Sequence, residues 1–187
     1  MRVIAGSAKG SRLGPVPPGA RPVSDRAREG LFSSLGGEIR HARVLDLYAG
    51  TGALGIEALS RGADHVVFVD RARPAVEAIR HNVALTQLTE QATIHRSECL
   101  AFLRKGNGTD PPFDLAFLDP PYDAEGPDIE EAMRVLADGW LRESGWTVVL
   151  TRGSASSMPV IPLHWLARRR LRYGDSLLIV YQEDRWV

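Results

Sequence analysis

The chain has 187 residues, of which 44% are hydrophobic and 25% are charged, and its formal net charge is zero. This profile is typical of one globular domain, and no apolar run approaches the roughly 18 residues of a membrane span, so we expect neither a membrane segment nor a secretory leader. The single cysteine and five scattered histidines show no disulfide or metal-ligand spacing, so we expect a cytoplasmic protein without a metal site.

The neutral total hides an uneven charge distribution. Acidic residues gather in the middle of the chain, around residues 123–131. Basic residues gather near both ends: Arg2, Lys9, Arg12, Arg21, Arg26 and Arg28, then Arg168, Arg169, Arg170 and Arg172. Because phosphate binding depends on local charge, one face could hold a polyanion, although a solvated arginine-rich surface is an equal alternative.

The first 37 residues form an extension before the main repeat of elements. Residues 2–13 predict two short extended pieces around Lys9-Gly10, that is, a small hairpin. A proline-rich connector follows, and then a helix that is capped by Ser24 or Asp25 and ends at Gly36-Gly37.

From residue 38 onward, short Val/Leu-rich runs alternate with helical patterns. Such runs indicate parallel strands covered on both faces, and thus a doubly wound α/β sheet. Two further runs, 165–173 and 177–181, flank Gly174-Asp175 and predict a closing antiparallel hairpin. We therefore predict a single Rossmann-like domain of the methyltransferase type over residues 1–187, with a seven-stranded, mostly parallel sheet; its extension covers 1–37 and its core 38–187. The other expected strands are 44–47, 66–69, 92–95, 113–118 and 146–150, and the expected core helices are 53–60, 74–85, a short one ending at 103, and 129–137.

A glycine-rich loop follows the first core strand. Gly50, Gly52 and Gly55 match G-x-G-x-x-G between a strand and a helix, where a nucleotide can approach the backbone closely. A dinucleotide enzyme would fit the glycines equally well, as would a loop with no ligand. Asp46, however, would repel a pyrophosphate and favours a cationic ligand such as S-adenosylmethionine.

Two further acids follow the next strands. Asp70 is placed to accept hydrogen bonds from both ribose hydroxyls of an adenosine, or simply to cap the next helix. Glu98 could accept from an adenine amino group, with the backbone N–H of Cys99 nearby, or complement a helix dipole.

The most specific motif is Asp119-Pro120-Pro121-Tyr122, after the fourth core strand. The two prolines stiffen the backbone, so that the Asp119 carboxylate and the Pro120 carbonyl become fixed acceptors for the two N–H groups of a planar amine. Tyr122 could stack on the base that carries this amine. A Pro-Pro turn with a surface tyrosine is the alternative.

With these motifs, the sequence resembles the bacterial 16S rRNA (guanine(966)-N(2))-methyltransferase family within the class I S-adenosylmethionine-dependent methyltransferases. The resemblance covers nearly the whole chain. It is carried by residues 2–6 with Gly10 and Leu13, by 21–22, 24–26 and 28–29, by 45–52, by 118–122 and by 173–175.

The resemblance implies methylation of a guanine N2 in 16S rRNA by an enzyme that releases S-adenosyl-L-homocysteine. The sequence leaves open whether the substrate is naked RNA, the 30S subunit or an assembly intermediate, and we expect a monomer. It assigns catalysis to Asp119, Pro120 and Tyr122. It assigns cofactor binding to Asp46, Tyr48, Gly50, Thr51, Gly52, Gly55, Asp70, Glu98 and Cys99. It assigns RNA contact to Lys9, Arg12, Arg21, Arg26 and Arg28.

Three alternatives stay open at this point. The same chemistry could act on adenine N6 or on a protein amide, since Asp-Pro-Pro-Tyr does not distinguish planar amines. The second is a nicotinamide oxidoreductase, which would need a catalytic acid or a Lys/Tyr pair beyond the fourth core strand, and none is convincing. The third is a non-catalytic ribosome-assembly factor, which would not explain Asp119 and Tyr122.

Overall fold

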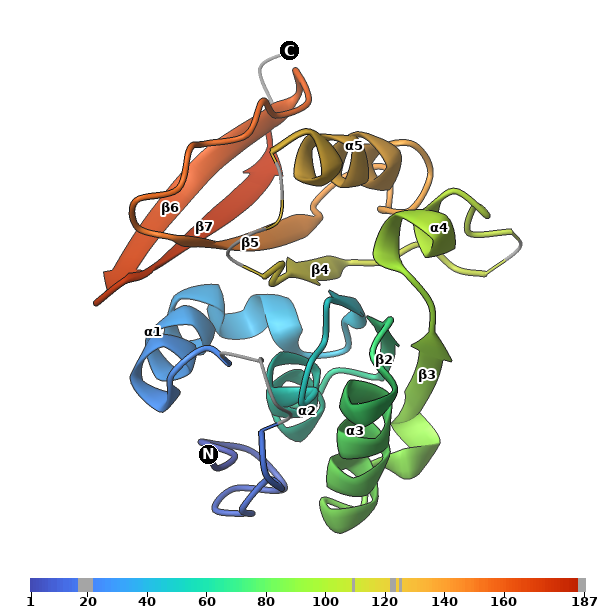
Figure 1. The fold of residues 1–187 in the computed structure, drawn as a ribbon, viewed down its shortest axis with the longest axis vertical. Coiled ribbons are helices and arrows are strands. Elements are labelled where there is room, and N and C mark those ends of the chain that lie inside the picture. Colours follow the sequence, from blue (N-terminus) through green and yellow to red (C-terminus); the bar gives the residue numbers. More distant parts are fainter. Residues whose placement is uncertain (17–21, 109, 122–123, 125, 185–187) are drawn as a thin grey trace.

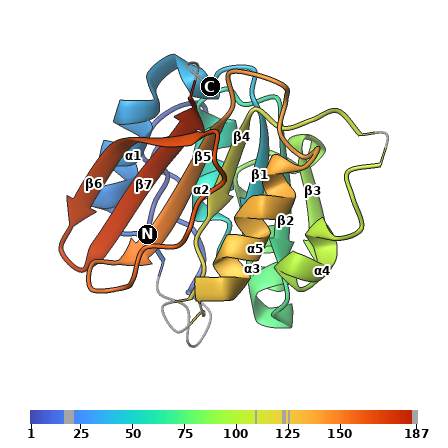
Figure 2. The same ribbon diagram turned by 90° about the horizontal axis from the view of Figure 1, so that it is seen from above.

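A computed structural model describes residues 1–16, 22–108, 110–121, 124 and 126–184. Its centre is a seven-stranded sheet with the order β3-β2-β1-β4-β5-β7-β6 (Figures 1 and 2). The strands are β1 (Arg43–Leu47), β2 (His65–Asp70), β3 (Ala92–Arg96), β4 (Leu115–Leu118), β5 (Thr147–Gly153), β6 (Trp165–Tyr173) and β7 (Ser176–Glu183). The helices are α1 (Asp25–Leu35), α2 (Ala53–Ser60), α3 (Arg73–Leu85), α4 (Cys99–Leu103) and α5 (Gly126–Ala137), with 3-10 turns at Gly36–Ile39 and Thr89–Gln91.

The pairing confirms the predicted mostly parallel sheet with an antiparallel end. Strands β1 to β5 run parallel, and Leu47 is in register with both Val69 and Leu118. Strand β7 inserts between β5 and β6 and is antiparallel to both. The carboxyl ends of β1 to β5 therefore share one edge of the sheet, here called the carboxyl edge, and the β6–β7 turn lies at that same edge because Gly153 pairs with Ser176.

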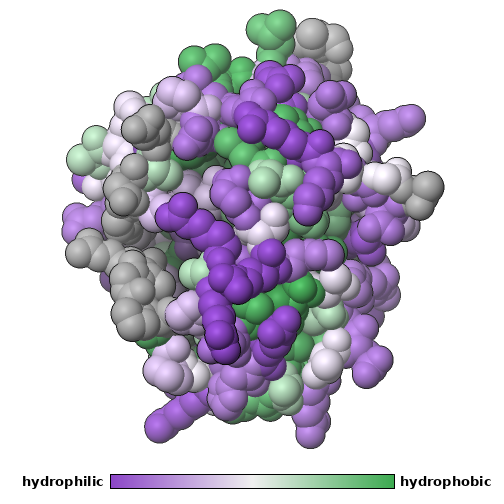
Figure 3. All heavy atoms as spheres, turned by 45° about the vertical axis from the view of Figure 1, so that its right-hand side comes forward, coloured by the Kyte–Doolittle hydropathy of each residue, from purple (hydrophilic) through white to green (hydrophobic). Residues whose placement is uncertain are grey.

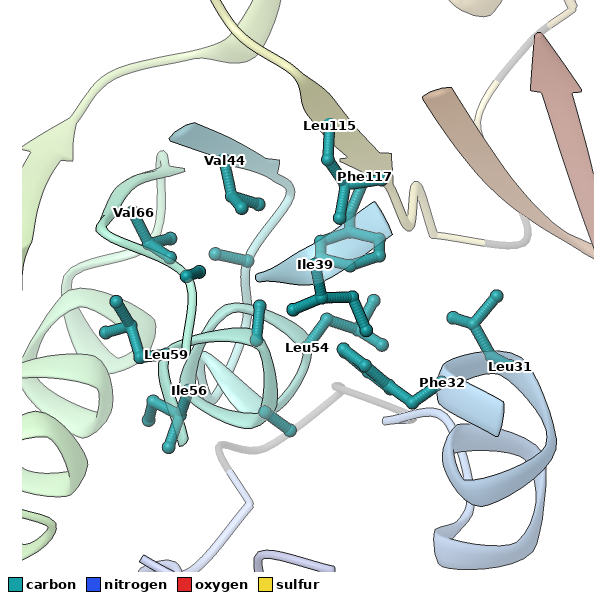
Figure 4. Packing of buried hydrophobic residues seen from close by; sticks show 14 of the residues in the cluster. Leu31, Phe32, Ile39, Val44, Leu54, Ile56, Leu59, Val66, Leu115 and Phe117 are labelled. Carbon is teal, nitrogen blue, oxygen red and sulfur yellow. The ribbon is translucent and has the colours of Figure 1, made fainter. Parts of the chain in front are cut away.

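Helices cover both faces of the sheet (Figure 1). On one face, α1, α2 and α3 bury a core that includes Leu31 and Phe32 against Leu54 and Phe117 (Figure 4). On the other, α4 and α5 bury a second core around Leu118, Leu136 and Trp140. Apolar residues on both sides of β1 and β4 explain why those strands read as continuous hydrophobic runs.

The N-terminal segment, residues 1–16, packs against α2 and α3. The expected hairpin consists of one antiparallel bridge, between Arg2 and Arg12. Within the loop, Ile4 and Ala5 donate their backbone N–H groups to the buried Glu57 carboxylate, at 2.8 and 3.1 Å. The N–H groups of Ile4 and Ala5 thus bond to α2, while those of Val3, Gly10 and Leu13 bond across the hairpin.

Several predicted boundaries shift by one to three residues, and the shift at the start of β4 has an identifiable reason. Strand β4 begins at Leu115 rather than at residue 113, because Phe113 forms a separate bridge with Leu141 and donates its N–H to the Trp140 carbonyl. Helix α5 begins at Gly126, three residues before the expected start at Ile129.

One face of the molecule is mainly polar. The face shown in Figure 3 is predominantly hydrophilic, with smaller hydrophobic patches between the polar side chains. Within the described ranges, no helix is both long and apolar enough to cross a membrane.

Candidate active site

Three of the predicted acids meet at the carboxyl edge. Asp46 lies in β1, Asp70 ends β2, and Asp119 follows β4 directly. Burial raises the pKa of the Asp46 carboxyl well above its usual range, and the negative charges of Asp119 and Asp70 add to this rise. A phosphate would be repelled from this edge.

The Asp46 carboxylate has one oxygen committed and one free. Its Oδ2 accepts a hydrogen bond from the Gly55 N–H at 2.9 Å. Its Oδ1 is buried and has no hydrogen-bond partner in the described part of the chain. Because an unsatisfied buried carboxylate oxygen is costly, this atom is suited to a ligand that brings N–H donors or positive charge.

The glycine loop holds its shape through close packing and backbone conformation. Tyr48, Gly50 and Gly52 have positive φ values of 58°, 57° and 76°. Gly55 packs so tightly on β2 that a Cβ there would lie 2.3 Å from Cε1 of Phe68. Only glycine fits this position without displacing the ring, so the loop sits close to the strand ends, with the Thr51 side chain buried beneath it.

Asp70 joins the glycine loop to the second strand. Its Oδ2 accepts from the Gly50 N–H at 2.9 Å, and its Oδ1 accepts from the Ala72 N–H at 2.8 Å. The half-buried carboxylate is therefore fixed in orientation beside the loop.

Glu98 is exposed and caps its own helix. Its carboxylate accepts from the N–H groups of Leu100 and Ala101 at 3.0 and 2.6 Å, which corresponds to the helix-end alternative considered for this residue. The next residue, Cys99, is buried, and burial raises the pKa of its thiol. An adenine contact by either residue stays a prediction.

Asp119 has a raised pKa. Burial raises the pKa of its carboxyl to about 7, and the neighbouring Thr151 hydroxyl on β5 partly opposes this rise. The Asp119 N–H bonds to the Leu47 carbonyl at 3.3 Å, and the following Pro120 is buried. The structure therefore holds this carboxyl next to β1 in an environment where it can exchange a proton near neutral pH.

Two predicted site residues, Tyr122 and Arg21, lie outside the described residues. The stacking role of Tyr122 and the RNA contact of Arg21 stay predictions.

The predicted RNA contacts divide into exposed and buried side chains. Lys9, Arg12 and Arg26 are exposed. Arg28 is wholly buried, and its Nη2 donates to the Arg2 carbonyl at 2.6 Å and to Asp25 at 2.7 Å. The prediction that Arg28 contacts RNA is therefore wrong for this conformation, because the N-terminal segment covers its guanidinium.

The prediction missed Asn82, a buried amide on α3. Its Oδ1 accepts from the Gly14 N–H at 2.7 Å, and its Nδ2 donates to the Thr51 carbonyl at 2.9 Å. Asn82 therefore ties the N-terminal segment to the glycine loop. A polar residue among the apolar positions Ile79 and Val83 was the signal that could have found it.

The prediction also missed Thr151. This side chain is buried on β5 next to Asp119, and its hydroxyl lowers the pKa of that carboxyl. Among the described residues, no group of three or more His, Cys, Asp or Glu side chains is arranged to hold a metal ion.

Comparison with known proteins covers almost the entire chain. A family model described as Conserved hypothetical protein 95 matches residues 1–182. The protein named Ribosomal RNA small subunit methyltransferase D from Escherichia coli (strain K12) is 35% identical, over 98% of this chain and 90% of that protein. The protein of the same name from Haemophilus influenzae is 34% identical, over 97% and 93%. The solved structure of a hypothetical protein from Thermus thermophilus has a TM-score of 0.81 and 30% identity, and covers 97% of this chain and 99% of that one.

Proposed function

This chain belongs to the Conserved hypothetical protein 95 family, and from that membership we propose that it is an S-adenosylmethionine-dependent methyltransferase acting on the N2 amino group of a guanine in small-subunit rRNA. The names of the full-length relatives support a methyltransferase of small-subunit rRNA. The observation that carries the proposal is the juxtaposition of the acids Asp46 and Asp119 at one end of adjacent parallel strands.

The residues at the carboxyl edge fit S-adenosylmethionine. The unpartnered Oδ1 of Asp46 would accept from its ammonium, and Asp70 would accept from its ribose hydroxyls. The acids also favour a ligand whose net charge is positive over one with a pyrophosphate. When bound, this cofactor supplies an electrophilic methyl group carried on a sulfonium.

The residues after β4 act on the target amine. The Asp119 carboxylate and the Pro120 carbonyl accept hydrogen bonds from the two N–H groups of this amine. These two hydrogen bonds fix the plane of the base, so that the nitrogen lone pair is available to the cofactor site. Holding the reacting groups in this orientation contributes up to ~7–11 kcal/mol to lowering the barrier. Asp119 then takes up the proton that the alkylated nitrogen releases, a role compatible with a pKa near 7.

We propose a cytoplasmic monomer that acts on an unpaired or easily extruded nucleotide. Extrusion of a base costs a few kcal/mol and least for one already unpaired, so a loop guanine within the 30S subunit is the expected substrate.

Nucleoside mass spectrometry tests the proposal directly. 30S subunits from a strain lacking the enzyme are incubated with purified protein and methyl-labelled S-adenosylmethionine, and their rRNA is digested to nucleosides. The label should appear in N2-methylguanosine. Label in N6-methyladenosine instead would mean that adenine is the target. If parallel incubations label only duplex DNA or protein, the substrate is not rRNA.

A further inference from the structure

The arginine-rich strand β6 contains two kinds of arginine. Arg169 donates to Glu38 at 2.6 Å and to the Ser34 carbonyl, so it joins β6 to α1 and the turn after it. Arg168 donates to the Glu183 carbonyl at 3.4 Å. Arg170 and Arg172 are exposed, and neither forms an ion pair within the described part of the chain.

The two unpaired arginines lie close to the proposed catalytic edge. Arg172 is in register with Leu177 of β7, which in turn pairs with Arg152 of β5. Leu150, two residues before Arg152, pairs with Leu118, the residue before Asp119. At about 4.8 Å between strands, β6 lies about 14 Å from β4, which is within reach of a nucleotide or two from the target base.

Arg26 on α1 approaches this basic surface at Arg172, whereas Arg170 projects from the face of β6 that is turned away from α1. Helix α1 lies beside β6, the outermost strand (Figure 2). Between them is a hollow of about 510 Å³ that is lined by Ser24, Arg26, Arg172, Tyr173 and Gly174. Arg26 and Arg172 therefore border one concave surface, although they are 146 positions apart in the sequence.

A buried arginine reinforces the positive charge of this region. Arg152 is 4% exposed, and its Nε has no hydrogen-bond partner in the described residues. Directly opposite residues on neighbouring antiparallel strands project to the same face, so Arg152 and Arg172 lie on either side of Leu177 on one face. An arginine keeps its charge when buried, so Arg152 adds to the potential without offering a contact of its own.

We propose that Arg26, Arg170 and Arg172, here called the arginine rim, bind the phosphodiester backbone of the rRNA next to the target guanine. This inference rests on the proposed function, since it supplies the RNA path to that site. Exposed guanidinium groups without acidic partners, spaced along a strand edge and around a hollow, match a chain of phosphates in charge and shape. Asp175 in the β6–β7 turn offsets part of this charge.

The test compares two double variants that remove equal charge. Arg170→Gln/Arg172→Gln changes the rim, whereas Arg40→Gln/Arg80→Gln removes two exposed arginines from before β1 and from α3. Equilibrium binding to 30S subunits from a strain lacking the enzyme is measured over a salt series, with S-adenosylhomocysteine affinity as a check on the site. The rim variant should bind 30S subunits about tenfold more weakly. The slope of its plot of log affinity against log salt concentration should be smaller in magnitude by about two. The control variant should match the wild type, and all three proteins should bind S-adenosylhomocysteine equally.

Two results would overturn the inference: rim and control variants with the same affinity and salt slope, or a rim variant whose loss is independent of salt. Neither result bears on catalysis, because the assay measures binding. If the wild type binds 30S subunits but methylates no guanine, the proposed function fails, while the comparison of variants still decides the role of the rim.

Discussion

The pKa of Asp119 depends on residues that are distant from it in the sequence. Its place after β4 was readable from the Asp-Pro-Pro-Tyr motif, because two prolines cannot continue a strand or a helix interior. Its pKa of about 7 depends on burial, which raises it, and on Thr151, which lowers it. Thr151 is 32 positions away and reaches Asp119 only through the pairing of β4 with β5. The sequence therefore predicts the residue but not its proton affinity.

Replacing the carboxylate should separate catalysis from cofactor binding. Asp119→Asn keeps the shape of the side chain but presents one amide in place of the proton acceptor, so turnover should fall by about 100-fold or more. Affinity for S-adenosylhomocysteine, measured by calorimetry, should stay within about twofold of the wild type. A comparable loss of cofactor affinity would mean that Asp119 serves the cofactor rather than the base.

The raised pKa gives a pH dependence to both activity and stability. In the proposed mechanism the carboxylate form of Asp119 is the proton acceptor, so turnover should rise as pH increases through about 7. In the unfolded chain the Asp119 carboxyl has an ordinary pKa of about 4, so it has already lost its proton at pH 7. Between about pH 4 and 7 the folded state thus holds the extra proton, and the free energy of unfolding falls as pH rises across this window. Because the raised pKa of Asp46 also contributes, urea unfolding should show a steeper decline in the wild type than in Asp119→Asn; parallel pH profiles would contradict it.

Arg28 marks the limit of reading single residues. The nearest basic residue in the sequence, Arg26, is exposed, and only the fold reveals that Arg28 is buried and donates to the Arg2 carbonyl of the N-terminal segment. Asn82 could have been flagged as a polar residue on an apolar helix face. Its two partners, however, are 68 and 31 positions away, and no local pattern identifies them.

At the level of elements, the Val/Leu runs and turn residues predicted every core strand, and the hairpin at the end is confirmed. The insertion of β7 between β5 and β6 was not predictable, because strand order depends on pairing between distant segments.

The N-terminal segment was predicted as a hairpin that contacts RNA. Its attachment to α2 follows from Glu57 and Ser60, two polar residues in a helix that is otherwise apolar and wholly buried.

The attachment of the N-terminal segment to α2 can be tested with Gly6→Ala, and Gly10→Ala is the matched control. An added Cβ at Gly6 would lie 1.6 Å from the Ser60 carbonyl oxygen, whereas one at Gly10 would meet nothing within 4 Å, and both glycines have φ near +86°. Gly6→Ala should therefore displace the segment from α2, while Gly10→Ala should cost only about 1–2 kcal/mol of backbone strain. Hydrogen exchange at the Ser7 and Ala8 amides, which bond to Ser60, should accelerate strongly in Gly6→Ala alone. Equal acceleration in both variants would mean that the segment is held by its own turn.

Asn82 connects the N-terminal segment to the glycine loop, and its two hydrogen bonds can be separated. Asn82→Asp keeps an acceptor for the Gly14 N–H but places a carboxylate oxygen against the Thr51 carbonyl. Because a buried acceptor facing another acceptor costs about 1–3 kcal/mol, S-adenosylhomocysteine should bind about tenfold or more weakly. Asn82→Ala loses both bonds and serves as the comparison; if calorimetry shows unchanged affinity in both, the loop is held without Asn82.

At the scale of the whole molecule, zero net charge conceals a separation between acids at the carboxyl edge and exposed basic residues elsewhere. The acids suit a cationic cofactor, and the arginine rim suits a polyanion. Composition alone could not predict this arrangement, since it depends on how the fold brings the acids of β1, β2 and β4 together and places α1 beside β6.

The N-terminal segment belongs to the main core of the molecule, and its removal should show this. Val3 and Leu13 are 1% and 7% exposed and pack in the same core as α1 and α2. Deleting residues 1–13 exposes the surface that these side chains cover, at about 1.5–3 kcal/mol for each, and removes two N–H donors from the buried Glu57 carboxylate. The free energy of unfolding in urea should therefore fall by at least about 3 kcal/mol, and affinity for S-adenosylhomocysteine should fall with it through the shift of α2 and the glycine loop. If the truncated protein instead unfolds at the same urea concentration and loses only RNA affinity, the segment acts as an independent RNA-binding arm.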